Sequence, residues 1–217
     1  MKLVVTIPAY NEEKTISKVI AEIPKKIHGI SKIEILVIDD GSTDSTSQKA
    51  RAAGARVVRN TRNCGLAHSF ARGLAAALER GADVVVNTDA DFQYNQTQIP
   101  LLVKPILDGD ADIVLGSRFL GSIEYMPAQK KIGNMAVSGL MSFLTGKRLT
   151  DSQTGFRAFS AEAALRINVF SGFTYTQETI LEAVEKKIKV IEVPCDFRRR
   201  ADSSRLISSV FDYAYKA

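Results

Sequence analysis

Short runs of apolar, mainly β-branched residues alternate with segments of helical periodicity over the first half of the chain. In the first helical segment, Ile16, Val19, Ile20 and Ile23 recur at the spacing of one helix face. Strands that alternate with helices favour βαβ units, so the predicted fold class is α/β with a mostly parallel sheet. The predicted strands in this half are Lys2–Ile7, Ile33–Asp39, Ala55–Arg59, Val84–Thr88 and Ile113–Leu115.

After Arg118 the alternation stops, and a polar loop at Gly146–Gly155 separates two helical segments. No internal repeat and no low-complexity segment divides the 217 residues, so we expect a single domain. The helices predicted along the chain are Ile16–Ile23, Ser45–Ala53, Ala67–Arg80, Lys130–Thr145, Ala161–Ile167 and Gln177–Lys187, and a last strand is predicted at Val190–Pro194.

The composition is that of a soluble globular protein, with 45% hydrophobic and 24% charged residues. A chain of this length can bury a large core without disulfides. Cys64 and Cys195 lie far apart and match no metal-ligand spacing, which indicates two reduced thiols and no zinc site. Because the sequence has no signal-peptide pattern and no run of 18 apolar residues, we expect a cytoplasmic protein, peripheral at the cytoplasmic face of a membrane.

The net charge of +5 fits an anionic ligand or a membrane surface. Basic residues concentrate between Lys186 and Arg205, which makes the end of the chain its basic pole. Phe197 is the only aromatic residue of this segment. Nucleic-acid binding is therefore not expected, because single-stranded nucleic acid binds to basic patches with interleaved aromatic side chains.

Two acidic clusters follow predicted strands, where α/β proteins bind ligands. The first runs from Asp39 to Asp44 and contains Gly41. Ser42, Thr43 and Asp44 are good capping residues for the helix that follows, so a purely structural role is one interpretation. A carboxylate that accepts hydrogen bonds from a nucleobase or ribose is the other.

The second cluster is Asp89-Ala90-Asp91, followed by Gln93. Alternate residues of an extended chain point the same way, so Asp89, Asp91 and Gln93 can face one cation. Oxygen ligands of this kind suit Mg²⁺ or Mn²⁺, whose remaining ligands are water and substrate phosphate. The cluster therefore predicts a Mg²⁺ or Mn²⁺ site.

In order and spacing, these motifs and several others resemble family 2 glycosyltransferases, and within them the dolichyl- or polyprenyl-phosphate hexosyltransferases. The resemblance covers about residues 3 to 207 and rests on seven segments in register. They are Ile7–Glu12, Asp39–Asp44, Asn63–Ala67 with Gly73, Asp89–Gln93, Gly116–Arg118, Asp151–Arg157 and the tail from Glu192 to Arg205.

The resemblance implies a GT-A fold, which is a Rossmann-like sheet with helices on both faces, in one domain spanning residues 1–217. Residues 1–118 would bind the nucleotide sugar, GDP-mannose or UDP-glucose, and residues 119–205 would bind the acceptor. The implied nucleotide-sugar contacts are Pro8, Tyr10, Glu12, Asp40, Asp89 and Ala90, the implied metal ligands are Asp89, Asp91 and Gln93, and the implied catalytic residues are Asp91, Arg118 and Asp151.

The acceptor decides what further chemistry is needed. A hydroxyl acceptor needs a general base, whereas a lipid monophosphate is already charged at pH 7 and needs cations. The chain offers such cations, which favours a dolichyl or polyprenyl phosphate and an inverting transfer; a hydroxyl-directed family 2 enzyme is the alternative. Asp151 could steer the acceptor loop or act as a weak base, with Arg157 as its partner. The cations are Arg118, Lys131, Arg200 and Arg205.

Two positions depart from the family pattern: Tyr94-Asn95-Gln96 stands where a proline is common, and Ser204-Arg205 replaces Ser-Lys. Residues 206–217 place Leu206, Val210 and other apolar residues on one helical face. They are predicted to form an amphipathic helix, which either lies in a membrane interface or packs on the domain.

Two other protein classes fit poorly. A phosphoacceptor signalling domain has its acidic pair after the first strand and a lysine after a later one, whereas here the pair follows the second strand and Gly116-Ser117-Arg118 has no lysine. A dinucleotide oxidoreductase is excluded because no Gly-x-Gly-x-x-Gly follows a strand.

Overall fold

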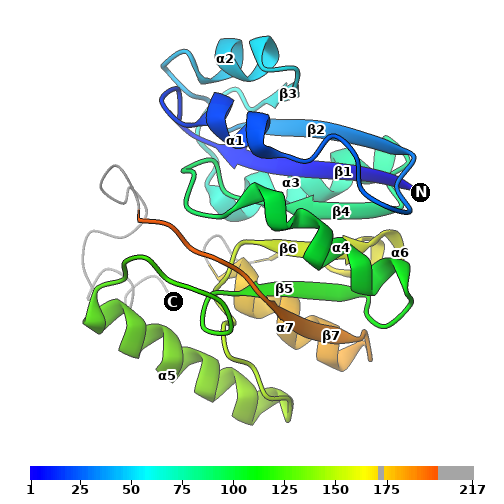
Figure 1. The fold of residues 1–217 in the computed structure, drawn as a ribbon, viewed down its shortest axis with the longest axis vertical. Coiled ribbons are helices and arrows are strands. Elements are labelled where there is room, and N and C mark those ends of the chain that lie inside the picture. The colour runs from blue at the N-terminus through cyan, green and yellow to red at the C-terminus, as the bar shows by residue number, and fades with distance from the viewer. Residues whose placement is uncertain (171–173, 200–217) are drawn as a thin grey trace.

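The computed structural model describes residues 1–170 and 174–199, which form one seven-stranded sheet covered by helices (Figure 1). The strand order is β3-β2-β1-β4-β6-β5-β7. The strands are β1 (Lys2–Ala9), β2 (Lys32–Asp39), β3 (Arg56–Arg59), β4 (Val84–Asn87), β5 (Ile113–Ser117), β6 (Arg157–Ser160) and β7 (Val190–Pro194).

Helices cover both faces of the sheet because apolar residues alternate along its buried strands. In β1, Val5 and Ile7 face a core shared with α1, α2 and α4, whereas Val4 faces a core shared with α3, α6 and α7. The helices are α1 (Ile16–Glu22), α2 (Thr46–Ala52), α3 (Leu66–Glu79), α4 (Ile99–Leu107) after the short 3₁₀ helix η1 (Gln96–Gln98), α5 (Ala128–Thr145), α6 (Ala161–Arg166) and α7 (Tyr175–Glu185).

One strand, β6, runs against the others. β1 pairs in parallel with β2 and β4, β2 with β3, and β5 with β7, whereas β6 is antiparallel to both β4 and β5. Since β6 starts where its neighbours end, the loop that enters it lies at their carboxyl edge. Asn87 at the end of β4 is paired with Arg157 at the start of β6.

The predicted α/β class with a mostly parallel sheet is confirmed, and all predicted strands and helices are present with small shifts of their ends. Three elements of the structure were not predicted: the short 3₁₀ helix η1, helix α4 and strand β6. Strand β6 has only four residues and begins with Arg157, so it lacks an apolar run. Helix α4 contains Pro100 and Pro105; Pro100 is tolerated because it lies in the first turn, where its missing N–H has no partner to lose.

The expectation of two reduced thiols is also confirmed. Cys64 is a free and exposed thiol, and Cys195 is free and buried. Burial raises the pKa of the Cys195 thiol to about 12, so this group stays protonated at neutral pH.

Arg157 is fully buried beneath the loop that enters β6. Its guanidinium donates to the carbonyls of Ser152, Thr154 and Thr176 at 2.7–2.8 Å, and to the Thr179 hydroxyl at 2.7 Å. Burial lowers its pKa to about 10, which still leaves the side chain charged at pH 7. Arg157 therefore ties this loop to the start of α7.

Replacing Arg157 should destabilise the fold. In Arg157→Met, three buried carbonyls lose their donor, so we expect the free energy of unfolding to fall by about 3–5 kcal/mol. Urea unfolding measures this loss. Lys104→Met is the matched control, because Lys104 is exposed and pairs only with Asp108, and it should cost about 0.5 kcal/mol or less. Equal midpoints for the two variants would contradict the role given to Arg157.

Candidate active site

The sequence motifs gather at one edge of the sheet. Because β1, β2 and β4 are parallel neighbours, the segments that follow them lie side by side: Tyr10–Glu12, Asp39–Asp44 and Asp89–Asp91. The loop that enters β6 and the carboxyl ends of β5 and β7 lie at the same edge. The fold therefore brings together the predicted donor and acceptor motifs.

The loops after β1 and β2 are bonded to each other. The Asn11 N–H donates to Ser42 Oγ at 2.9 Å, and Asn11 Oδ1 accepts from the Thr43 N–H at 2.8 Å. These bonds hold Asn11 at a φ of 55°, a conformation that few residues except glycine adopt easily. Of the predicted nucleotide contacts here, Pro8 is buried in β1, Tyr10 is 37% exposed, and Glu12 is half-buried.

Asp40 is 4% exposed and organises the neighbouring loop. Its Oδ1 accepts from Asn60 Nδ2 at 2.6 Å and from the Cys64 N–H at 2.9 Å, and its Oδ2 accepts from the Gly65 N–H at 2.8 Å. These contacts give Asp40 a structural role, and its contact with a nucleotide stays a prediction. The capping interpretation of this cluster holds for Asp44, whose Oδ1 accepts from the Thr46 N–H at the start of α2.

Asp89 and Asp91 are half-buried after β4, with Ala90 buried between them. Asp89 packs against the loop that enters β6: a Cβ atom on Gly155 would lie 2.8 Å from Asp89 Oδ1, so a larger residue there would require the Asp89 carboxylate to shift. Asp91 Oδ1 accepts from the Gln93 N–H at 3.1 Å, and Phe92 between them has a φ of 66°. The turn is thus folded tightly around the two carboxylates.

This donor set fits a hard divalent cation. Two carboxylates and the Gln93 amide oxygen are the oxygen ligands that Mg²⁺ and Mn²⁺ prefer, and such ions commonly keep water and substrate phosphate as further ligands. In residues 1–170 and 174–199, no cluster of three or more His, Cys, Asp or Glu side chains suits a metal. A bound cation would therefore draw its other ligands from substrate and water.

Tyr94 connects the donor and acceptor sides of the site, a role not predicted from the sequence. Its buried hydroxyl accepts from the Gly155 N–H at 3.0 Å, and its ring stacks on Phe156 at 5.1 Å and meets Phe197 edge-on at 5.5 Å. Burial raises the pKa of this hydroxyl, so it stays protonated. The nearest signal in the sequence was the departure from the family pattern beside Tyr94, where Asn95 stands two residues after Gln93 in place of a common proline.

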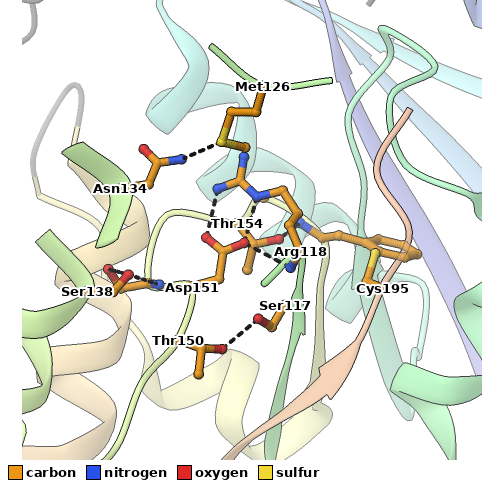
Figure 2. Close-up of polar contacts among 12 residues, drawn as sticks. Ser117, Arg118, Met126, Asn134, Ser138, Thr150, Asp151, Thr154 and Cys195 are labelled. Carbon is orange, nitrogen blue, oxygen red and sulfur yellow. Dashed lines mark hydrogen bonds and ion pairs between the residues drawn. The ribbon is translucent and has the colours of Figure 1, made fainter. Parts of the chain in front are cut away.

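Arg118 and Asp151, two of the predicted catalytic residues, form a buried ion pair between the end of β5 and the loop that enters β6 (Figure 2). Arg118 Nε donates to Asp151 Oδ2 at 2.6 Å and Nη2 donates to Oδ1 at 2.7 Å, while the Arg118 N–H also donates to Oδ2. The two residues are 5% and 0% exposed. Burial lowers the pKa of the guanidinium, but the hydrogen bonds and charge of Asp151 outweigh that effect and raise it.

The partner of Asp151 is therefore Arg118, and the prediction that Arg157 pairs with Asp151 is wrong. Arg157 donates to backbone carbonyls and a hydroxyl instead. Arg118 also lies over the Phe197 ring, with 5.1 Å between the guanidinium carbon and the ring centroid. The site thus contains a charged pair fixed between β5 and the loop that enters β6.

Glu192 on β7 holds this loop in place. Its carboxylate accepts from the Thr150 N–H and hydroxyl at 2.8 Å each, and from the Asp151 N–H at 2.8 Å. The backbone of Asp151 is therefore fixed by Glu192, while its side chain is bonded to Arg118.

The basic segment after β7 runs beside the loop of the second acidic cluster. The Arg198 N–H donates to the Gln93 carbonyl at 2.7 Å, and Gln93 Nε2 donates back to the Arg198 carbonyl at 3.3 Å. The Arg198 guanidinium pairs with Glu22 and lies over the Phe92 ring. Of the predicted phosphate-binding cations, Lys131 is exposed near the start of α5, and Arg200 and Arg205 lie outside the described residues.

Asp151→Asn tests the buried pair. The variant keeps the shape of the side chain but leaves the Arg118 guanidinium buried without its counter-charge, so we expect a loss of about 3–5 kcal/mol in the free energy of unfolding. Guanidinium chloride unfolding measures it. Glu162→Gln is the control, because Glu162 and Arg166 form an exposed pair, and it should change stability by about 0.5 kcal/mol or less. A wild-type midpoint for Asp151→Asn would refute the pairing.

Three known proteins are similar to this chain over most of its length. A dolichyl-phosphate hexose transferase of Haloferax volcanii is 34% identical over 205 residues, covering 94% of this chain and 86% of the relative. A dolichol-phosphate mannosyltransferase of Pyrococcus furiosus is 32% identical, covering 98% of this chain and 62% of the relative. Among solved structures, the glucosyl-3-phosphoglycerate synthase of Mycobacterium tuberculosis in complex with Mn²⁺, uridine diphosphate and phosphoglyceric acid has a TM-score of 0.72 and 25% identity, covering 94% of this chain and 71% of that chain.

The mixed sheet is thus a GT-A fold, as the sequence resemblance implied. The sequence model of "Glycosyl transferase family 2" matches residues 4–168, and the chain therefore belongs to the family 2 glycosyltransferases.

Proposed function

We propose that this transferase moves a hexose from a nucleotide sugar, GDP-mannose or UDP-glucose, to dolichyl or polyprenyl phosphate with inversion at the anomeric carbon. The observation that carries the proposal is the bonding of Gln93 to Arg198, which joins the basic segment after β7 to the acidic loop after β4. The basic segment, which carries cations proposed for the acceptor phosphate, therefore begins beside the carboxylates proposed for the donor diphosphate. The names of the relatives from Haloferax volcanii and Pyrococcus furiosus support the same acceptor class.

The donor half comprises residues 1–118. Tyr10 offers an exposed ring for stacking on the base, and Pro8, Glu12 and Asp40 shape or line the pocket for base and ribose. Asp89 and Ala90 lie nearest the diphosphate. We assign Asp89, Asp91 and Gln93 to a Mg²⁺ or Mn²⁺ ion, which when bound neutralises charge on the departing nucleoside diphosphate. The related synthase was crystallised with Mn²⁺ and uridine diphosphate.

The acceptor half comprises residues 119–205. Arg118, Lys131, Arg200 and Arg205 are the cations proposed for the lipid phosphate. Two nitrogens of the Arg118 guanidinium, Nε and Nη2, are bonded to Asp151. The other N–H groups of the guanidinium are therefore held in a fixed orientation for the lipid phosphate. Asp151 then acts as a positioning residue for Arg118, since a carboxylate bonded in this way is poorly placed to take a proton.

The chemistry follows from the charge of the acceptor. A phosphate oxygen attacks the anomeric carbon from the face opposite the diphosphate; the new C–O bond forms as the old one breaks, and the nucleoside diphosphate leaves with the bonding electrons. Because the second pKa of a phosphomonoester is about 6, the attacking oxygen is already charged at pH 7 and needs no general base. The product is a hexosyl lipid phosphate with inverted configuration.

Such an acceptor places the enzyme at a membrane surface, and we propose that it works at the cytoplasmic face. In the described part of the chain, no helix is both long enough and apolar enough to cross a bilayer. The predicted amphipathic segment 206–217 lies outside the described residues.

Asp91→Asn tests the donor site. Removing one charge from the metal ligands should lower turnover roughly 100-fold and weaken the binding of GDP or UDP in Mn²⁺, as measured by isothermal titration. EDTA should weaken nucleotide binding to the wild type in the same way. Asp110→Asn is the control, since Asp110 is exposed away from the carboxyl edge, before β5. If Asp91→Asn keeps wild-type turnover and Mn²⁺ dependence, the metal site is assigned to the wrong residues.

The acceptor class is tested with two lipids that differ only in the phosphate. Radiolabelled hexose should pass from GDP-mannose or UDP-glucose to a polyprenyl phosphate and not to the corresponding polyprenol, because the cations select the charged nucleophile. Transfer to hydroxyl acceptors without transfer to the phosphate would replace this proposal with the alternative, a glycosyltransferase of polysaccharide or glycan synthesis.

A further inference from the structure

The loop after β4 buries a tyrosine, Tyr94, whose hydroxyl is not needed for packing. Its ring stacks on Phe156 and meets Phe197 edge-on, and a phenylalanine would fill the same space. The residue is 2% exposed, and a hydroxyl removed from water costs free energy unless it is hydrogen-bonded. The Tyr94 hydroxyl accepts from the Gly155 N–H at 3.0 Å and from Thr154 Oγ1 at 3.3 Å. Its contribution therefore lies in these bonds to the loop that enters β6.

Gly155 is held on three sides, and a predicted metal ligand lies on one of them. Its N–H donates to Tyr94, and its carbonyl accepts from Asn87 Nδ2 at 2.9 Å, at the end of β4. On the third side, a Cβ atom on Gly155 would lie 2.8 Å from Asp89 Oδ1 and 3.3 Å from Asp89 Oδ2. Because protein interiors are close-packed, a displacement of the Asp89 carboxylate on binding a cation presses on Gly155 or opens a gap beside it.

The loop between Asp151 and Gly155 has little freedom to absorb such a displacement. The buried Arg157 guanidinium donates to two carbonyls of this loop at 2.7–2.8 Å. At its other end, Glu192 accepts from the Asp151 N–H at 2.8 Å. Held at these points, the loop behaves as one stiff segment. The position of Gly155 is therefore tied to that of Asp151 and of Arg118, which is bonded to it.

The ring of Tyr94 provides a second connection to Arg118. Phe197 lies edge-on to the Tyr94 ring, with 5.5 Å between the ring centroids, and Arg118 lies over the Phe197 ring. Tyr94 is itself held to the end of β4, because its carbonyl accepts from Gln96 Nε2 at 3.2 Å and Gln96 Oε1 accepts from Thr88 Oγ1 at 3.0 Å. Both the hydroxyl and the ring of Tyr94 thus join the loop after β4 to the surroundings of Arg118.

The Tyr94 hydroxyl lies within the electric fields of both sides of the site. Burial raises its pKa, the charge of Arg118 lowers it, and the charges of Asp89 and Asp151 raise it. The hydroxyl therefore stays protonated and serves as a neutral contact between charged groups.

From these contacts we infer that Tyr94 is a positioning residue that couples the proposed metal site to Arg118 and the loop that enters β6. The inference rests on the proposed function for the roles of Asp89 as a cation ligand and of Arg118 as a phosphate contact. The Tyr94 hydroxyl holds Gly155 against Asp89, and its ring holds Phe197 against Arg118. Binding of a cation and a nucleoside diphosphate at the second acidic cluster therefore fixes this loop, and with it the guanidinium proposed to bind the lipid phosphate.

Hydrogen exchange of the backbone amides of residues 150–156 in the full chain tests the coupling. In the wild type, saturating Mn²⁺ with GDP or UDP, whichever binds more tightly, should slow this exchange roughly ten-fold relative to the unliganded protein. Tyr94→Phe keeps the ring and removes the hydroxyl, so it should still bind the nucleotide but lose this ligand-dependent protection. Ser160→Ala is the matched control and should keep the protection, because Ser160 Oγ also accepts a backbone N–H, from Ala163 at 3.1 Å, but at the opposite end of β6.

Transfer to a water-soluble, short-chain polyprenyl phosphate provides a second readout. Misplacement of a contact to the attacking group affects the reacting geometry more than the binding of the donor. Tyr94→Phe should therefore lower kcat roughly 100-fold and leave the KM for the nucleotide sugar unchanged. Ser160→Ala should keep the wild-type kcat.

Several results would overturn the inference: unchanged exchange of residues 150–156 when the wild type binds Mn²⁺ and nucleotide, full protection or wild-type kcat in Tyr94→Phe, or an equal loss of protection in Ser160→Ala. Failure of the proposed function gives a different result. If Tyr94→Phe loses the protection but the wild type transfers no hexose to the polyprenyl phosphate, the coupling stands and the acceptor is wrongly assigned. If the wild type binds neither Mn²⁺ nor nucleotide, the proposed donor site and the coupling both fail.

Discussion

The buried pair of Arg118 and Asp151 is the interaction on which the arrangement of β5, β7 and the loop that enters β6 depends. Two charges removed from water are stable only when geometry and hydrogen bonds compensate for their lost hydration. Here Asp151 accepts three bonds from the backbone and side chain of Arg118. Its own N–H is bonded to Glu192. The pair therefore holds the end of β5, the loop that enters β6 and strand β7 in one arrangement.

The antiparallel strand β6 makes that pair possible, and β6 is one of the elements that the sequence did not predict. The parallel strands and most helices follow from apolar periodicity, which is strong in segments such as Val84–Val86. Arg157-Ala158-Phe159-Ser160 has no such pattern. Its conformation is imposed by β4 and β5 on either side, so it is a consequence of tertiary pairing and not of local preference.

Only part of the site was predicted from the sequence. Residue types and spacing placed Asp89 and Asp91 at the carboxyl end of a strand, where ligands of α/β proteins bind, whereas the roles of Arg118 and Asp151 were implied by the family resemblance. The prediction that Arg157 is the partner of Asp151 was wrong, because Arg118 reaches Asp151 from the end of β5 and Arg157 lies beneath the loop. Residue spacing also could not show that Asp40 is surrounded by Asn60, Cys64 and Gly65. Such contacts depend on the path of loops, which periodicity does not encode.

Helix α5 illustrates the same limit in another form. Its sequence predicts a helix, and an apolar stripe is normally read as the buried side. The structure reverses that assignment because serines on the other side bond the loop that carries Asp151 and Ser152. The polar side is thus used to hold this loop, and the apolar side is exposed.

The buried pair of Arg118 and Asp151 suits an acceptor that is already charged. An enzyme that activates a hydroxyl needs a carboxylate or imidazole free to accept a proton near the attacking oxygen. In this site both oxygens of the Asp151 carboxylate are instead bonded to the Arg118 guanidinium, and Asp151 is fully buried. Such a carboxylate, with both oxygens bonded to the guanidinium, is placed to orient a cation. A nucleophile that is already anionic requires orientation and counter-charge, which is what Asp151 and Arg118 together can provide.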